Sequence, residues 1–143
     1  MDQASKIVSH MMDHDAFSQW LGIKVLEVRA GYALLSMKVR REMVNGFLVC
    51  HGGITFSLAD SAFAFASNGH GRLSLALEAN ISYPAPVHVD DTLTAEAVEL
   101  SIGNRTGVYQ VTITNQDETV VGVFRGTVYR TQKDFEEELA KQG

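Results

Sequence analysis

The amino-acid sequence predicts an α+β fold in which a curved antiparallel sheet wraps around one long buried helix. Residues 52–67 read GGITFSLADSAFAFAS and are apolar on nearly every side of a helix, which is typical of a helix covered by other elements. Four segments with strand-like patterns follow, and turn-rich links between them favour antiparallel hairpins. A sheet wrapped around the helix is the simplest way to cover it.

Two strands are predicted before this helix and four after it. The first pair occupies residues 25–28 and 32–39, and alternate residues from Ala33 to Val39 share one apolar face. The later strands are expected, as a four-strand meander, at residues 73–83, 92–100, 107–115 and 120–129. Near the end of the second of these the apolar face changes sides at Val98, which indicates a possible β-bulge.

Both ends of the chain are predicted to be helical additions to a single domain of residues 1–143. Residues 3–19 favour a surface helix inside an N-terminal extension of residues 1–20. The charged tail of residues 131–143 is predicted to form a frayed terminal helix. The sequence Asn68-Gly69-His70-Gly71 predicts where the central helix ends.

Composition excludes several classes of protein. The net charge of -5 and the absence of a basic block argue against general nucleic-acid binding. No apolar segment is long and uninterrupted enough to span a bilayer, and residues 1–20 lack the apolar run of a signal peptide, so we expect a cytoplasmic protein with no membrane partner. The single cysteine, Cys50, cannot form an internal disulfide. The histidines lack metal-ligand spacing, and no metal or other cofactor is predicted.

The central helix contains one ionisable side chain, that of Asp60. Burying an unpaired carboxylate costs several kcal/mol or forces its protonation. Carboxylates with perturbed pKa values gather at active sites, so we predict that Asp60 is an acid/base or nucleophilic group. The alternative is a carboxylate that faces a polar groove or caps a backbone break.

The sequence His51-Gly52-Gly53 stands at the start of the same helix. Free backbone N–H groups there can hold a carbonyl oxygen as it becomes an oxyanion, although a tight turn alone would also explain the glycines. Gly52 and Asp60 are eight residues apart, which is about 12 Å along a helix axis. Asp60 therefore cannot serve the donors of its own chain, and we predict a two-fold dimer whose active site is shared.

The stretch from Asn45 to Ala64, NGFLVCHGGITFSLADSAFA, resembles the acyl-CoA thioesterases of the hot-dog fold. Within them it is similar to the PaaI-type enzymes of phenylacetate degradation, and the sequence VFRGTVYR at Val123 to Arg130 strengthens the match. The resemblance covers residues 20–130. It implies an acyl-CoA substrate with an aryl-acyl group such as (hydroxy)phenylacetyl, and homodimers that pair into homotetramers.

The resemblance also implies roles for four residues. Asp60 would activate water or attack the thioester itself, and the Gly52 N–H would polarise the thioester carbonyl. Asn45 would help to place the carbonyl or the water, unless it only forms a turn with the glycine that follows. His51 would support the loop through hydrogen bonds. Some relatives hold the water with a Ser or Thr on the following strand, where the matching region of this chain reads Ala76, Leu77, Glu78, Ala79.

Four further residues are predicted to contact the substrate. Gly53 lies beside the oxyanion donor, Phe47 and Phe63 could shape the acyl pocket, and Arg105 could meet the phosphates of coenzyme A. Aromatic residues on a buried helix more often belong to the core, and an arginine at a strand edge is more often solvated.

Two other functions remain open from the sequence. A hot-dog hydratase or dehydratase would act on acyl thioesters through a histidine paired with an acid, whereas here His51 is followed at once by two glycines. A non-catalytic acyl-CoA-binding sensor is the second alternative.

Overall fold

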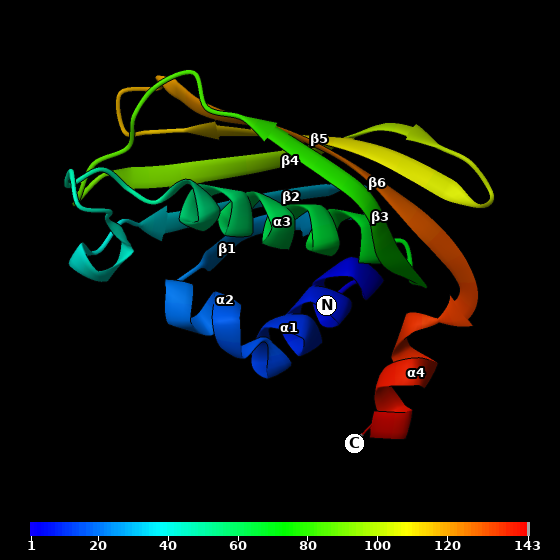
Figure 1. Cartoon of the computed structure of the whole chain (residues 1–143). Helices are drawn as coiled ribbons and strands as arrows, with labels where there is room; N and C mark the ends of the chain where they lie inside the picture. The colour runs from blue at the N-terminus through cyan, green and yellow to red at the C-terminus, as the bar shows by residue number, and fades with distance from the viewer. Residues whose placement is uncertain (143) are drawn as a thin grey trace.

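The computed structural model describes residues 1–142 and confirms the α+β hot-dog architecture (Figure 1). A six-stranded antiparallel sheet curves around the central helix α3 (Gly52–Asn68). The strands are β1 (Lys24–Arg29), β2 (Tyr32–Lys38), β3 (Arg72–Ser82), β4 (Thr92–Ile102), β5 (Thr106–Thr114) and β6 (Val120–Asp134). They lie in the sheet in the order β1-β2-β4-β5-β6-β3.

The core lies between α3 and the concave face of the sheet. Alternating burial is found in β2, β4 and β5, where Leu35, Ala95 and Val111 are fully buried. They pack in one cluster with the sheet-facing residues of α3, including Leu58 and Ala62. The predicted β-bulge is also present, since the pairing of β4 with β5 shifts register between Glu99 and Ser101.

One strand lies elsewhere than the predicted meander would place it. Only β4, β5 and β6 form a meander, while β3 pairs with β6 at the far edge of the sheet and β4 pairs with β2. The link from β3 to β4 contains Pro84 and Pro86, and it crosses the end of the sheet instead of forming a hairpin. Local patterns could not reveal this, because two β-strands that follow each other in sequence show the same alternation whether or not they pair.

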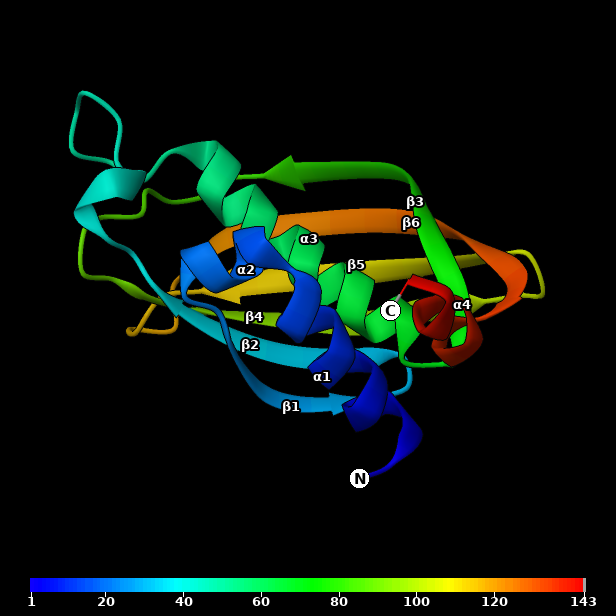
Figure 2. The same ribbon diagram turned by 90° about the horizontal axis from the view of Figure 1, so that it is seen from below.

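The N-terminal extension consists of two helices and not the single helix predicted over residues 3–19. The helices α1 (Gln3–His14) and α2 (Ala16–Leu21) cover part of α3 on the side away from the sheet (Figure 2). The break falls at Asp15, whose side chain accepts a hydrogen bond from the Ser18 N–H at 2.9 Å and so caps α2.

The C-terminal tail also begins later than predicted. Strand β6 continues to Asp134, so residues 131–134 belong to the sheet, and the terminal helix α4 is Phe135–Gln142. Gly143 lies outside the described residues. A short 3-10 helix, η1 (Arg41–Met43), leads from β2 towards the loop before α3.

Gly126 in β6 allows the sheet to approach α3 closely, and this leads to a stability prediction. A Cβ atom added at Gly126 would lie 2.7 Å from Cζ of Phe63. We expect Gly126→Ala to lower the free energy of unfolding by about 1–3 kcal/mol, because the buried Phe63 ring has little room to move. Urea unfolding measures the change. Gly103→Ala is the matched control, since its Cβ would only reach 3.7 Å from the Thr106 carbonyl oxygen; an equal loss in both variants would contradict the explanation.

Candidate active site

The N-terminus of α3 presents a free backbone donor. The His51 side chain is the N-cap, and its Nδ1 accepts a hydrogen bond from the Gly53 N–H at 3.2 Å. The next N–H, of Ile54, donates to the His51 carbonyl oxygen at 2.9 Å. Within residues 1–142 the Gly52 N–H donates no hydrogen bond, so it is available to a ligand at the positive end of the helix dipole.

Tyr83, just after β3, holds this end of the helix, and sequence reasoning missed it. Its hydroxyl donates a hydrogen bond to the Gly52 carbonyl oxygen at 2.8 Å. A Cβ atom at Gly52 would lie 3.1 Å from Cζ of the Tyr83 ring, so this packing favours glycine there. Gly53 is exposed, and a Cβ atom there would meet only the His51 side chain, so the space beside the donor is open.

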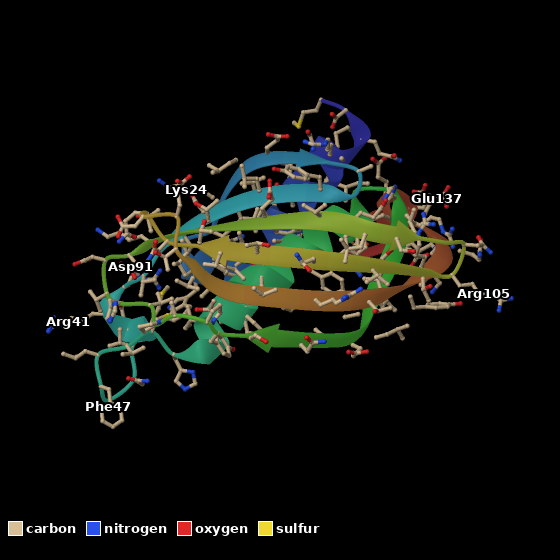
Figure 3. The ribbon with its side chains drawn as sticks, turned by 90° about the horizontal axis from the view of Figure 1, so that it is seen from above. Lys24, Arg41, Phe47, Asp91, Arg105 and Glu137 are labelled. Atoms are coloured by element: carbon tan, nitrogen blue, oxygen red, sulfur yellow. The ribbon has the colours of Figure 1, made fainter. Side chains whose placement is uncertain are left out.

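The loop before α3 is a small hairpin organised by Asn45. Its Oδ1 accepts hydrogen bonds from the Phe47 N–H at 2.9 Å and the Val49 N–H at 3.3 Å. The Asn45 oxygen is therefore used by the turn, and only its amide nitrogen is free to donate to a ligand. Phe47 is 88% exposed at the tip of this loop, where it projects from the molecule (Figure 3). The Phe47 side chain is therefore open to solvent in the single chain.

Asp60 lies on the face of α3 that turns away from the sheet. Together with Gly53, Ser57 and Ala64 it forms the open stripe of α3, a row of residues at helical spacing that the sheet does not cover. The expectation that Asp60 is buried is wrong for the single chain, in which Asp60 is exposed. The sequence of the helix is apolar on nearly every side because the open side carries mainly small residues, which can be exposed to solvent at little cost.

Two influences raise the pKa of Asp60 above its ordinary value. The larger is lost hydration, because neighbouring protein atoms displace part of the water around the carboxyl group, and the second is the nearby carboxylate of Asp15. Asp15 is held there because α2 packs on α3, where the Ser18 and Ser61 hydroxyl oxygens lie 2.8 Å apart. Asp60 is thus accessible to ligands and takes up a proton more readily than an ordinary carboxylate.

Two residues predicted to contact the substrate, Phe63 and Arg105, lie away from the helix face that carries Asp60. Phe63 is 1% exposed and packs in the core against the rings of Tyr109 and Phe124, so the prediction that it shapes an acyl pocket is corrected. It follows Asp60 by three residues, but it turns towards β6, where Gly126 receives its ring. Arg105 is exposed in the turn between β4 and β5, at the opposite end of the sheet from Phe47 (Figure 3).

The described residues were compared with what a metal site and a membrane-spanning helix require. Within residues 1–142 no group of three or more His, Cys, Asp or Glu side chains is placed to hold a metal ion. Over the same range, no helix has the length and apolar character needed to cross a bilayer.

Comparison with known proteins identifies the family. Residues 47–122 match the Thioesterase superfamily. The acyl-coenzyme A thioesterase PaaI of Escherichia coli is 42% identical over 120 residues, which cover 84% of this chain and 86% of that protein. The structure of the E. coli PaaI protein from the phenylacetic acid degradation operon matches with a TM-score of 0.90 and 39% identity, over 92% of this chain and 96% of that one.

A more distant structure comes from Streptococcus mutans, in a complex with acetyl CoA. It matches with a TM-score of 0.76 and 26% identity, over 78% of this chain and 90% of that one. The superfamily match includes the free Gly52 N–H, the His51 cap and Asp60. The chain belongs to the thioesterase superfamily, and within it to the hot-dog acyl-CoA thioesterases of the PaaI type.

Proposed function

We propose that this thioesterase hydrolyses aryl-acyl-CoA substrates, such as phenylacetyl-CoA or hydroxyphenylacetyl-CoA, at a site shared by two copies of the chain. The observation that carries the proposal is the open stripe of α3, which presents Asp60 with a raised pKa on a helix whose first N–H is free. A general base and an oxyanion donor are the two groups that thioester hydrolysis needs. The proposal includes the cytoplasmic location that the composition predicts.

In this mechanism Asp60 is the general base. It takes a proton from a water molecule as the water oxygen bonds to the thioester carbon, and the Gly52 N–H of the partner subunit stabilises the negative charge on the carbonyl oxygen. The C–S bond then breaks, and Asp60 returns the proton to the sulfur of coenzyme A. Direct attack by the Asp60 carboxylate is the alternative. Transfer of labelled oxygen from water into Asp60 during a single turnover distinguishes the two.

Two copies are needed because both groups lie on one straight element. Gly52 and Asp60 belong to the same uninterrupted α-helix, and eight residues of rise separate them by about 12 Å. A water molecule activated by Asp60 must lie within about 3.5 Å of the thioester carbon that it attacks. A second α3 running antiparallel beside the first would bring the partner's Gly52 next to Asp60.

The free edge of β3 is the surface that we propose for this pairing. Strand β3 is 11 residues long and, among the described strands, has a hydrogen-bonded neighbour, β6, on one side only. Its Leu75 and Leu77 side chains are 52% and 61% exposed. A long edge with exposed apolar residues is a ready template for a strand of another chain, and two-fold pairing of β3 edges would place the two α3 helices antiparallel. Pairing of such dimers into tetramers stays a prediction from the resemblance.

The remaining substrate contacts follow from this arrangement. Arg105 lies at the end of the sheet where α3 finishes, so antiparallel pairing would bring it towards the N-terminus of the partner's α3 and a CoA phosphate there. Phe47, at its exposed loop tip, would cover an acyl group bound between two copies. Gly53 would leave room for the thioester, and the free amide nitrogen of Asn45 would donate to it. The similarity to the E. coli protein from the phenylacetic acid degradation operon supports an aryl-acyl group.

The hydratase alternative is less well supported, because His51 has no acidic partner among its described hydrogen bonds and its Nδ1 is used by the Gly53 N–H. A panel of acyl-CoAs with a thiol-detecting dye tests the proposal. We expect thiol release from aryl-acyl-CoAs at a higher kcat/KM than from short aliphatic acyl-CoAs. Binding without thiol release would favour the sensor, and a change in enoyl absorbance without thiol release would favour the hydratase.

Asp15 provides a test of the electrostatics around Asp60. Only the ionised Asp60 can accept the water proton, so kcat/KM should fall as the pH drops through the pKa of Asp60. We expect Asp15→Asn to move this fall to lower pH, because the substitution removes a negative charge that raises that pKa. Asparagine can still cap α2. The pH profile of kcat/KM measures the shift, and Asp13→Asn, a charge change at an exposed position of α1, should leave the profile in place.

A further inference from the structure

The open stripe of α3 contains one hydroxyl group beside Asp60. Within α3, all of which is described, Ser61 and Ser67 are buried, and only Ser57 lies on the stripe with Gly53 and Asp60. Asp60 follows Ser57 by three residues, so their Cβ atoms are about 5–6 Å apart. Side chains on a helix lean towards its N-terminus, so the Asp60 carboxylate leans towards Ser57. Gly53, one turn further back, leaves the space in front of both groups open.

The hydroxyl hydrogen of Ser57 is already used. It is donated to the Gly53 carbonyl oxygen, with an O–O distance of 2.7 Å. The lone pairs of Ser57 Oγ are then available only to accept hydrogen bonds. A water molecule between Ser57 and Asp60 could donate one hydrogen to each of them, with about 3 Å to either oxygen. Both of its hydrogens would be directed to the helix, and a lone pair would point outward to the substrate.

We propose that Ser57 holds the hydrolytic water for Asp60, an inference that rests on the proposed thioester hydrolysis. The water donates one hydrogen to Asp60 and one to Ser57 Oγ. As its oxygen bonds to the thioester carbon, the first proton moves to Asp60 and the second stays on the oxygen that becomes the acid hydroxyl. The C–S electron pair leaves with the sulfur, which then receives the proton from Asp60. The strand residue Ala76 has no hydroxyl to perform this task.

Three variants test this role. Ser57→Ala should lower kcat roughly 10- to 100-fold with little change in KM, because the water loses its orientation while the thioester binds as before. Ser57→Thr keeps a hydroxyl and should retain most of the activity. Ser67→Ala is the matched control, since Ser67 also donates to a carbonyl oxygen of the same helix, that of Ala64, but lies away from Asp60. It should leave kcat unchanged.

Added hydroxylamine separates water placement from a general structural effect. It attacks the thioester in place of water and gives a hydroxamate, so Ser57→Ala should raise the ratio of hydroxamate to free acid. If the wild type releases thiol and Ser57→Ala either keeps the wild-type kcat or loses both products equally, the role of Ser57 is overturned while the proposed function stands. If the wild type itself releases no thiol from any acyl-CoA, the proposed function is overturned and the role of Ser57 with it.

Discussion

Replacing Asp60 by asparagine is expected to lower kcat/KM for an acyl-CoA by about 100- to 10,000-fold, the range that a general base contributes. Asparagine has nearly the same shape and can still hold water, but it cannot accept a proton. The loss should appear in kcat, because the proton moves only in the transition state. Thiol release followed over a range of substrate concentrations gives both constants. Asp13→Asn, in which an exposed aspartate of α1 changes in the same way, is the control.

Asp60→Asn should lower the activity but raise the stability of the folded chain. The pKa of Asp60 is raised in the folded chain, so above the pKa of the unfolded state the ionised carboxylate favours unfolding. Asp60→Asn should therefore raise the melting temperature at neutral pH, and this gain should vanish when the pH falls below the pKa of the unfolded carboxyl group. A variant that loses both activity and stability would show that Asp60 is part of the packing and not of the chemistry.

The sequence is sufficient to predict that a sheet covers one central helix, because the patterns that indicate the strands and the helix are local. In β2 and β5 every second residue is apolar, and these residues face α3. The central helix was recognisable because an apolar run of this length, bounded by paired glycines and by Asn68-Gly69, fits few other elements. Local patterns of this kind are set by the period of each element and do not depend on its neighbours.

The position of β3 and the burial of Phe63 depend on distant parts of the chain, whereas the break at Asp15 has a local cause. The position of β3 at the edge is decided by its pairing with β6, more than 40 residues later. The alternation of apolar and polar residues along a strand does not reveal which strand it pairs with. The break at Asp15 depends on a capping hydrogen bond that competes with continuation of the helix. Phe63 could be placed in the core only once Gly126 was known to lie opposite it.

The residues of the candidate site also differ in whether the sequence could identify them. One short stretch of sequence contains Asn45, His51, Gly52 and Asp60, so a single motif is enough to identify all four. The contribution of Tyr83 was invisible, because it reaches Gly52 from a residue 31 positions later. Composition does not distinguish an open helix face from a buried one, since alanine, serine and glycine suit either environment.

Mixing two inactive variants should restore activity if the site is shared between chains. Asp60→Asn keeps the oxyanion donor and loses the base. Gly52→Val keeps the base and should displace the donor, because a Cβ atom at Gly52 already meets the Tyr83 ring that holds this end of the helix. In a mixed dimer one of the two sites combines an intact Asp60 with an intact Gly52. Random pairing makes about half of the dimers mixed, so we expect about a quarter of wild-type activity.

Co-expression of the two variants with different affinity tags, followed by two-step purification, isolates the mixed dimer and should raise the recovered activity to about half. Two differently tagged copies of Asp60→Asn, purified in the same way, should stay inactive. Recovery by mixing is possible only when the base and the donor come from different chains, because a site within one chain remains broken in every combination. A mixed dimer as inactive as its parents would therefore disprove the shared site, even if Asp60→Asn alone abolishes hydrolysis.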